Sequence, residues 1–143
     1  MSTWFRHAGS LLLAGSVLAA MSTVLHPPTF HPLAAAFVVD ETRLAPLRWM
    51  AVHIGLGVGL WLWTLGWWAF YRGLEDRGAA RYALYGAVSG AVALAIWLPL
   101  LTAEVAGLPL LARAVDAGTA PLWWRVLWPV ILGSGYVAAL LHW

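Results

Sequence analysis

The chain has 143 residues, enough for one domain; hydrophobic residues make up 62% of it and charged residues 10%. Soluble domains carry roughly 45–50% apolar and about 25% charged residues, so this composition excludes a water-soluble domain of this size. The absence of cysteine excludes a disulfide scaffold and thiolate metal sites. The formal net charge is only +2 and the sequence has no run of basic residues, so the charge pattern does not indicate nucleic-acid binding.

Four apolar stretches are long enough to cross a bilayer as helices, which takes about 20 residues each. In chain order they lie at about 8–26, 48–71, 80–103 and 121–142. The alternation of apolar and polar residues that is typical of strands is absent from the sequence, and helices satisfy their own backbone in lipid. The sequence therefore predicts an all-α integral membrane protein: a single four-helix domain (residues 1–143) with up-down-up-down topology.

The three linkers differ in character. The first, about 27–47, opens with two prolines and contains an apolar piece, 33–39, which we expect to lie on the interface or dip into it. The second, about 72–79, is short and charged, which predicts an antiparallel hairpin between the second and third spans. The third, about 104–120, predicts a short amphipathic segment.

Arginine placement predicts the orientation, because cytoplasmic loops of membrane proteins are enriched in basic residues. Arg72, Arg77 and Arg81 crowd around the second linker, and Arg6 precedes the first span. We therefore expect both termini in the cytoplasm, with the protein in the inner membrane of a prokaryote. The apolar run that follows Arg6 also resembles a secretory signal peptide, and we expect it to be retained as the first span.

Small residues let membrane helices approach one another closely. Gly55 and Gly59 form one GxxxG pair and Gly86 and Gly90 another. They predict close helix packing, and the alternative is a flat cofactor lying against a glycine notch.

Eleven tryptophans are unusual in a chain of this length. Those near the predicted span ends are typical of an interfacial aromatic belt: Trp4, Trp49, Trp67, Trp68, Trp123, Trp124 and Trp143. Four lie deeper, and we expect them to face lipid, a neighbouring subunit or a bound aromatic molecule: Trp61, Trp63, Trp97 and Trp128.

Ionisable side chains inside a bilayer are costly, so each of them is a candidate functional group. Each predicted span contributes one at about the same depth: His26, His53, Glu104 and Arg125. His31 follows in the first linker. We expect these groups to converge near one face of the membrane.

The main hypothesis is a b-type haem with His26 and His53 as axial ligands, because haem iron accepts histidine and a four-helix bundle can enclose the ring. Gly57, one turn after His53, would leave room for the porphyrin edge, and Arg48 or Arg125 would meet a propionate. Glu104 would handle protons or contact a quinone. The predicted protein is a membrane electron carrier, a subunit of a respiratory or redox complex that exchanges electrons with quinol.

Several alternatives stay open. Copper or non-haem iron suits imidazole ligands from His26, His31 and His53, and His7 with His142 would allow a second haem. The histidines could instead be structural, in a cofactor-free accessory subunit that packs on a larger complex, or the chain could form an oligomeric proton-coupled transporter of small molecules. The expected partners are the lipid bilayer and other membrane subunits or further copies of the chain. P-loop, GxSxG and HExxH motifs are absent from the sequence, so no enzyme class is predicted.

Overall fold

The computed structural model describes residues 3–27, 32–75, 77–115 and 121–142, and every regular element in these ranges is a helix. Four of them are long and apolar enough to cross a membrane: α1 (Thr3–Leu25), α3 (Pro46–Leu74), α4 (Ala80–Thr102) with its continuation, and α6 (Leu122–His142). The predicted all-α membrane bundle is therefore confirmed. α1 begins earlier than predicted, and α3 extends beyond both of its predicted ends.

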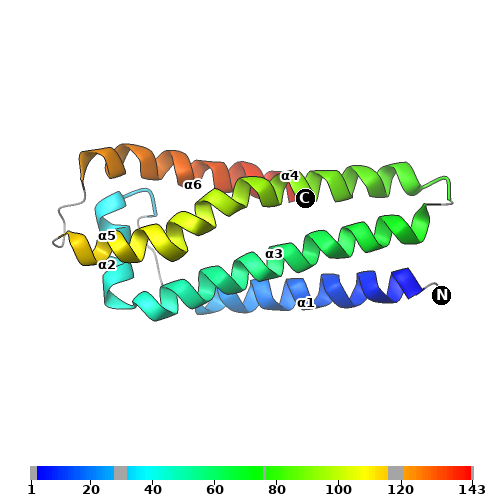
Figure 1. Ribbon diagram of the computed structural model, residues 1–143, viewed down its shortest axis with the longest axis horizontal. Coiled ribbons are helices and arrows are strands. Elements are labelled where there is room, and N and C mark those ends of the chain that lie inside the picture. The colour runs from blue at the N-terminus through cyan, green and yellow to red at the C-terminus, as the bar shows by residue number, and fades with distance from the viewer. Residues whose placement is uncertain (1–2, 28–31, 76, 116–120, 143) are drawn as a thin grey trace.

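The four long helices lie in a row and alternate in direction (Figure 1). α1 packs on α3, α3 packs on α4, and α4 packs on α6. α1 and α6 are the two ends of this row, and they share no extended contact within the described residues. One side of the bundle is consequently left open between them.

α1 is joined to α3 by small residues. The buried residues of α1 are Ala8, Gly15 and Ser22, spaced seven apart so that they share one face. A Cβ atom on Gly15 would lie 2.6 Å from the carbonyl oxygen of Gly59, and one on Gly55 would lie 2.4 Å from Ser22 Oγ. The first GxxxG pair therefore packs two helices closely, as predicted.

The second GxxxG pair makes looser contacts. A Cβ atom on Gly86 would lie 3.8 Å from the nearest atom of Trp67, and one on Gly90 would lie 3.9 Å from Thr64 Oγ1. These are ordinary van der Waals distances, so the α3–α4 contact does not depend on glycine at these two positions.

A short helix, α2 (Ala35–Leu44), crosses one end of the bundle and packs on α5 (Leu108–Ala114) (Figure 1). Arg43 joins the two, because its Nε donates to the carbonyl of Ala112 at 2.8 Å and its guanidinium also donates to the carbonyl of Val115. The apolar piece predicted at 33–39 thus forms the start of a helix, and its Val38 and Val39 are each 1% exposed.

The third linker differs from the prediction, because the helix does not end at residue 103. α4 runs without a break into a π-helical turn, η1 (Ala103–Gly107), and then into α5. Pro109 lacks the N–H that a regular α-helix would direct at the carbonyl of Val105, and a widened turn accommodates this loss. The π turn carries Glu104.

Because α2 and α5 cover this end of the bundle, several tryptophans here are buried, in contrast to the prediction. Trp49 and Trp124, which the sequence assigns to the aromatic belt, are only 2% and 4% exposed. Trp128 is also buried and donates from Nε1 to the carbonyl of Pro32 at 2.7 Å. These three side chains belong to the hydrophobic core at this end of the bundle, and Trp4 and Trp123 remain exposed as expected.

Candidate functional site

His53 is the centre of the site and is 3% exposed. It lies in α3 one turn after Trp49, and its Nδ1 is 2.7 Å from the carbonyl oxygen of that residue. A carbonyl oxygen can only accept, so Nδ1 carries a hydrogen. The other ring nitrogen, Nε2, faces the space between the helices.

His26 reaches the same point from the end of α1. Its Nδ1 donates to the carbonyl of Pro27 at 2.6 Å, and its Nε2 lies 3.3 Å from Nε2 of His53. Arg48 holds this end of α1 against α3, because its Nε donates to the carbonyl of Leu25 at 2.8 Å. That bond satisfies one of the carbonyls that a helix end leaves without a partner.

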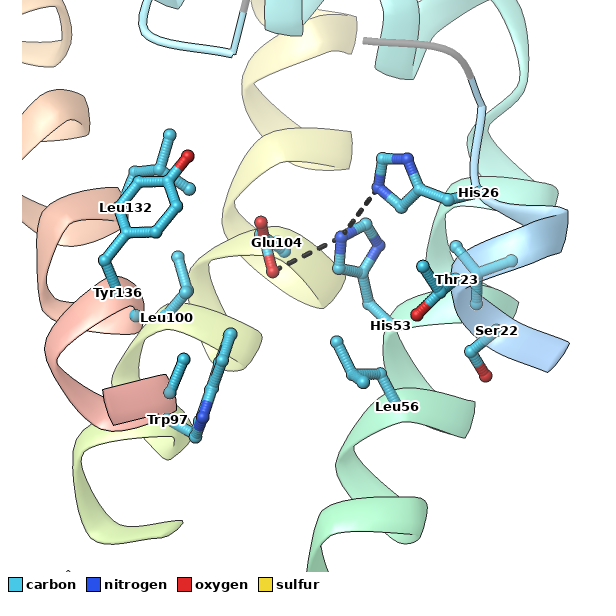
Figure 2. A pocket seen from close by; sticks show the side chains of 13 residues that line it. Ser22, Thr23, His26, His53, Leu56, Trp97, Leu100, Glu104, Leu132 and Tyr136 are labelled. Carbon is cyan, nitrogen blue, oxygen red and sulfur yellow. Dashed lines mark hydrogen bonds and ion pairs between the residues drawn. The ribbon is translucent and has the colours of Figure 1, made fainter. Parts of the chain in front are cut away.

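Glu104 approaches His53 from the π turn. Its Oε2 lies 3.3 Å from His53 Nε2, and the residue is 7% exposed. Trp49 stabilises the π turn, because its Nε1 donates to the carbonyl of Glu104 at 3.1 Å. Figure 2 shows the two contacts that join His26, His53 and Glu104, and we call these three residues the His–Glu cluster.

The cluster needs a proton. Both histidines use their Nδ1 hydrogen on a backbone carbonyl, so in their neutral forms both Nε2 atoms are acceptors. An ionised Glu104 would add a further acceptor beside them. Acceptors that face one another without a hydrogen repel, so at least one proton belongs between them. A proton on His53 Nε2 can be shared by His26 and Glu104, and it makes His53 a cation beside a carboxylate.

The position of the carboxylate favours His53 over His26 as the site of the proton, because Glu104 Oε2 lies 3.3 Å from His53 Nε2. Desolvation lowers the pKa of His26 below its ordinary value of 6.5, and the neighbouring His53 lowers it further. The Pro27 carbonyl and Glu104 act in the opposite direction with smaller effect. His26 is therefore the neutral acceptor of the cluster at neutral pH, and it is also the half-buried member nearest the helix end.

A pocket of about 440 Å³ lies beside the cluster and is lined by all four long helices. Its walls are mostly apolar, with Val52, Leu56 and Leu100 among them (Figure 2). Thr23 of α1 and Tyr136 of α6, both exposed, stand at its rim. The pocket thus opens on the side of the bundle where α1 and α6 are not joined.

Gly57 lies on another side of His53. It lines a second hollow of about 620 Å³, together with His53, Trp61 and Leu101. It does not line the pocket that holds His26 and Glu104. His53 therefore borders both hollows, and Gly57 borders only the second.

The remaining predicted site residues are not part of the cluster. Arg125 is exposed in the first turn of α6 and does not line the pocket. His7 is exposed near the opposite end of α1, beside Trp4. His31 and the side chain of His142 lie outside the described part of the chain.

The arrangement fits a proton more closely than a metal ion or a haem. Among the described residues, no group of three or more His, Cys, Asp or Glu side chains is arranged to hold a metal. The Trp49 ring lies 5.1 Å from the His26 ring and 4.8 Å from the His53 ring, between centroids. A macrocycle between the two histidines would need Trp49 and Glu104 to move. Haem, copper and non-haem iron stay predictions.

Two tryptophans of the site were not recognised as site residues from the sequence. Trp49 supports both histidines and Glu104, and Trp97 lines the pocket. The signal was available in the spacing, because Trp49 precedes His53 by four residues and Trp97 precedes Glu104 by seven. Both spacings place side chains on one face of a helix.

Comparison with known proteins gives no family for this chain, since no protein-family model, no curated protein and no solved structure matches it.

Proposed function

We propose that this protein binds the head group of a lipid-soluble quinone or quinol in the pocket, and that the His–Glu cluster exchanges protons with it. The observation that carries the proposal is the position of a buried cluster that needs a proton, at the wall of an apolar pocket open between α1 and α6. A ligand for this site must be apolar enough to arrive from lipid and must carry groups that gain or lose protons.

The dimensions of the pocket support a ligand of this kind. Its volume of about 440 Å³ falls in the range of roughly 300–1,000 Å³ that is typical of small-molecule sites. Such sites combine apolar walls with a few polar groups that fix orientation. Here His26, His53 and Glu104 gather at one end of the pocket.

The arrangement of the three residues, from the pocket toward the membrane surface, supports proton exchange with the water at that surface. Oxidation of a quinol releases protons and electrons, and reduction of a quinone takes both up. A phenolic proton passes to the ionised Glu104, and the proton on His53 Nε2 passes to His26, which is half-buried and leads toward the membrane surface. The electrons pass to a redox centre on a partner subunit, which agrees with the predicted place of the chain in a redox complex.

Quenching of tryptophan fluorescence by a benzoquinone with a decyl chain tests the proposal. We expect saturable quenching of the detergent-purified protein, because Trp97 lines the pocket and Trp49 contacts the cluster. His53→Leu and Glu104→Gln should each weaken binding about ten-fold or more, the effect of losing one hydrogen bond to a charged group. The matched control is His7→Leu, which removes an exposed histidine far from the pocket.

Decanol, which has the same chain without the quinone ring, is the control ligand. The proposal is wrong if quenching does not saturate, if decanol competes as well as the quinone does, or if both cluster variants bind like the wild type. Glu104→Gln guards against a folding failure in His53→Leu, because an amide in place of the carboxylate keeps the side-chain volume while it removes the charge that accepts a proton.

A b-type haem is the second candidate, and one observation favours it. Histidines that bind a metal commonly donate their other ring nitrogen to a carbonyl, and both His26 and His53 do so while their Nε2 atoms face one another. An optical spectrum of the protein, oxidised and then reduced with dithionite, tests this candidate. Low-spin α and β bands that His26→Ala and His53→Ala remove, and His31→Ala retains, would support it; a featureless spectrum after expression with haem would exclude it.

A further inference from the structure

Trp97 carries a buried donor that no other described residue satisfies. Its Nε1 is inaccessible to solvent, and no hydrogen-bond partner for it occurs among the described residues. An unsatisfied buried N–H costs roughly as much as a lost hydrogen bond, so such groups are uncommon in folded proteins. The side chain lines the pocket on the α4 side, at the end away from His26 (Figure 2).

Trp97 also marks the place where the pocket continues. A groove of about 430 Å³ runs on between α1, α3 and α6, and it shares Thr23, Leu56 and Trp97 with the pocket. Its other walls are apolar or small, among them Ala19, Leu60 and Trp63. Pocket and groove together form a channel that has the His–Glu cluster at one end and mostly apolar or small side chains at the other.

We infer that the indole N–H of Trp97 donates a hydrogen bond to the ligand oxygen remote from the His–Glu cluster, while the apolar chain of the ligand occupies the groove. The inference rests on the proposed function and specifies the ligand further. The ligand is a ring with oxygens at opposite positions, one of which faces His53 and Glu104 and the other Trp97.

The spacing of the two anchors agrees with such a ring. Trp97 and Glu104 are seven residues apart, which corresponds to about 10 Å along the helix axis at a rise of about 1.5 Å per residue. Two hydrogen bonds of about 2.9 Å each with a six-membered ring between them account for a separation of that order. A phenol with a single oxygen can reach one anchor only.

Trp124 provides a matched control. Its Nε1 is also buried without a partner among the described residues. However, Trp124 stacks on Trp128 at the start of α6 and lines neither the pocket nor the groove. Replacing either tryptophan by phenylalanine removes one unsatisfied donor, but only Trp97 is a side chain that lines the channel.

Calorimetric titration of the detergent-purified protein tests the inference, since this readout does not depend on tryptophan fluorescence. Trp97→Phe should bind decyl-benzoquinone about ten-fold more weakly than the wild type, and Trp124→Phe should bind it equally well. Decyl-phenol should bind the wild type and Trp97→Phe with the same affinity, because its only oxygen is held by the cluster.

The outcomes separate the two proposals. If the wild type binds the quinone, and His53→Leu weakens binding while Trp97→Phe does not, the inference is wrong and the proposed function stands. If the quinone does not bind the wild type, both are overturned. Equal weakening by Trp97→Phe and Trp124→Phe would mean that repacking, rather than a ligand contact, is responsible, and this would also contradict the inference. A loss of thermal stability in Trp97→Phe without ligand would identify such repacking.

Discussion

At the scale of single residues, the His–Glu cluster depends on the two carbonyls that hold the imidazole rings. The Pro27 and Trp49 carbonyls take up the Nδ1 hydrogens, and this turns both Nε2 atoms toward the interior. Without those bonds, either ring could carry its hydrogen on Nε2 instead and donate it to Nε2 of the other ring. Because the backbone fixes both tautomers, the cluster has to hold an additional proton, which two histidines free to change tautomer would not need.

Two substitutions at Glu104 should therefore differ. Glu104→Leu leaves a buried imidazolium without its counter-charge, a kind of loss that costs about 3–5 kcal/mol. Glu104→Gln should be much milder, because its amide can donate to His53 Nε2 and replace the shared proton. Thermal unfolding in detergent measures both. Equal destabilisation by the two variants would contradict the proton assignment.

The residues of the cluster could be predicted from the sequence, whereas their surroundings could not. His26, His53 and Glu104 are polar groups at a common depth in apolar spans, and a bilayer makes such groups conspicuous. The donor of Trp97, unsatisfied among the described residues, could be recognised only from the positions of its neighbours in the fold. Burial of Trp49 likewise depends on α2 and α5, which come from linkers.

At the scale of elements, the contact between α1 and α3 sets the distance between the two histidines. Around Gly15 and Gly59 the two helices approach through backbone and Cβ atoms, which cannot move aside for an added group as the end of a long side chain can. His26 follows the last residue of α1, and a displacement of this helix moves His26 relative to His53.

The glycines of α1 give a matched pair of variants. A side chain at Gly15 would meet the backbone of α3, whereas one at Gly9 would meet nothing within 4 Å. Gly15→Val should destabilise the protein by about 1–3 kcal/mol, as overpacking commonly does, and Gly9→Val should have a much smaller effect. Thermal unfolding in detergent would show the difference. Similar melting temperatures for the two variants would mean that the close approach of α1 and α3 is not needed.

The long helices could be predicted because a helix that crosses lipid must be a long apolar segment, and such segments are evident in the hydropathy of the sequence. The continuation of α4 through 103–114 could not be predicted, because the sequence becomes more polar there and resembles a linker. Its helical state is stabilised by contacts with α2, which lies far away in the sequence.

At the scale of the whole molecule, the two ends of the bundle are different. The hairpin between α3 and α4 is short and carries Arg72 and Arg77, while α2 and α5 cover the opposite end, where the cluster lies (Figure 1). The charge pattern predicts that the hairpin faces the cytoplasm, and this orientation stays a prediction.

The lack of native cysteine allows a direct measurement of the orientation. Gly78→Cys in the hairpin and Leu44→Cys at the end of α2 place single thiols at exposed positions at opposite ends of the bundle. A membrane-impermeant thiol reagent added to intact cells should label Leu44→Cys and spare Gly78→Cys. The reverse pattern would invert the predicted orientation, and labelling of both would contradict a four-span arrangement.

The open side between α1 and α6 has a thermodynamic consequence. A ligand that enters from the hydrocarbon layer has already left water, so covering its chain with protein gives little hydrophobic gain. Affinity then depends on the few polar contacts at the ring, and residence times should be short. Supply is not limiting, because an apolar molecule is concentrated in the bilayer itself. Such a site suits a mobile carrier that exchanges at each cycle rather than a cofactor that remains bound.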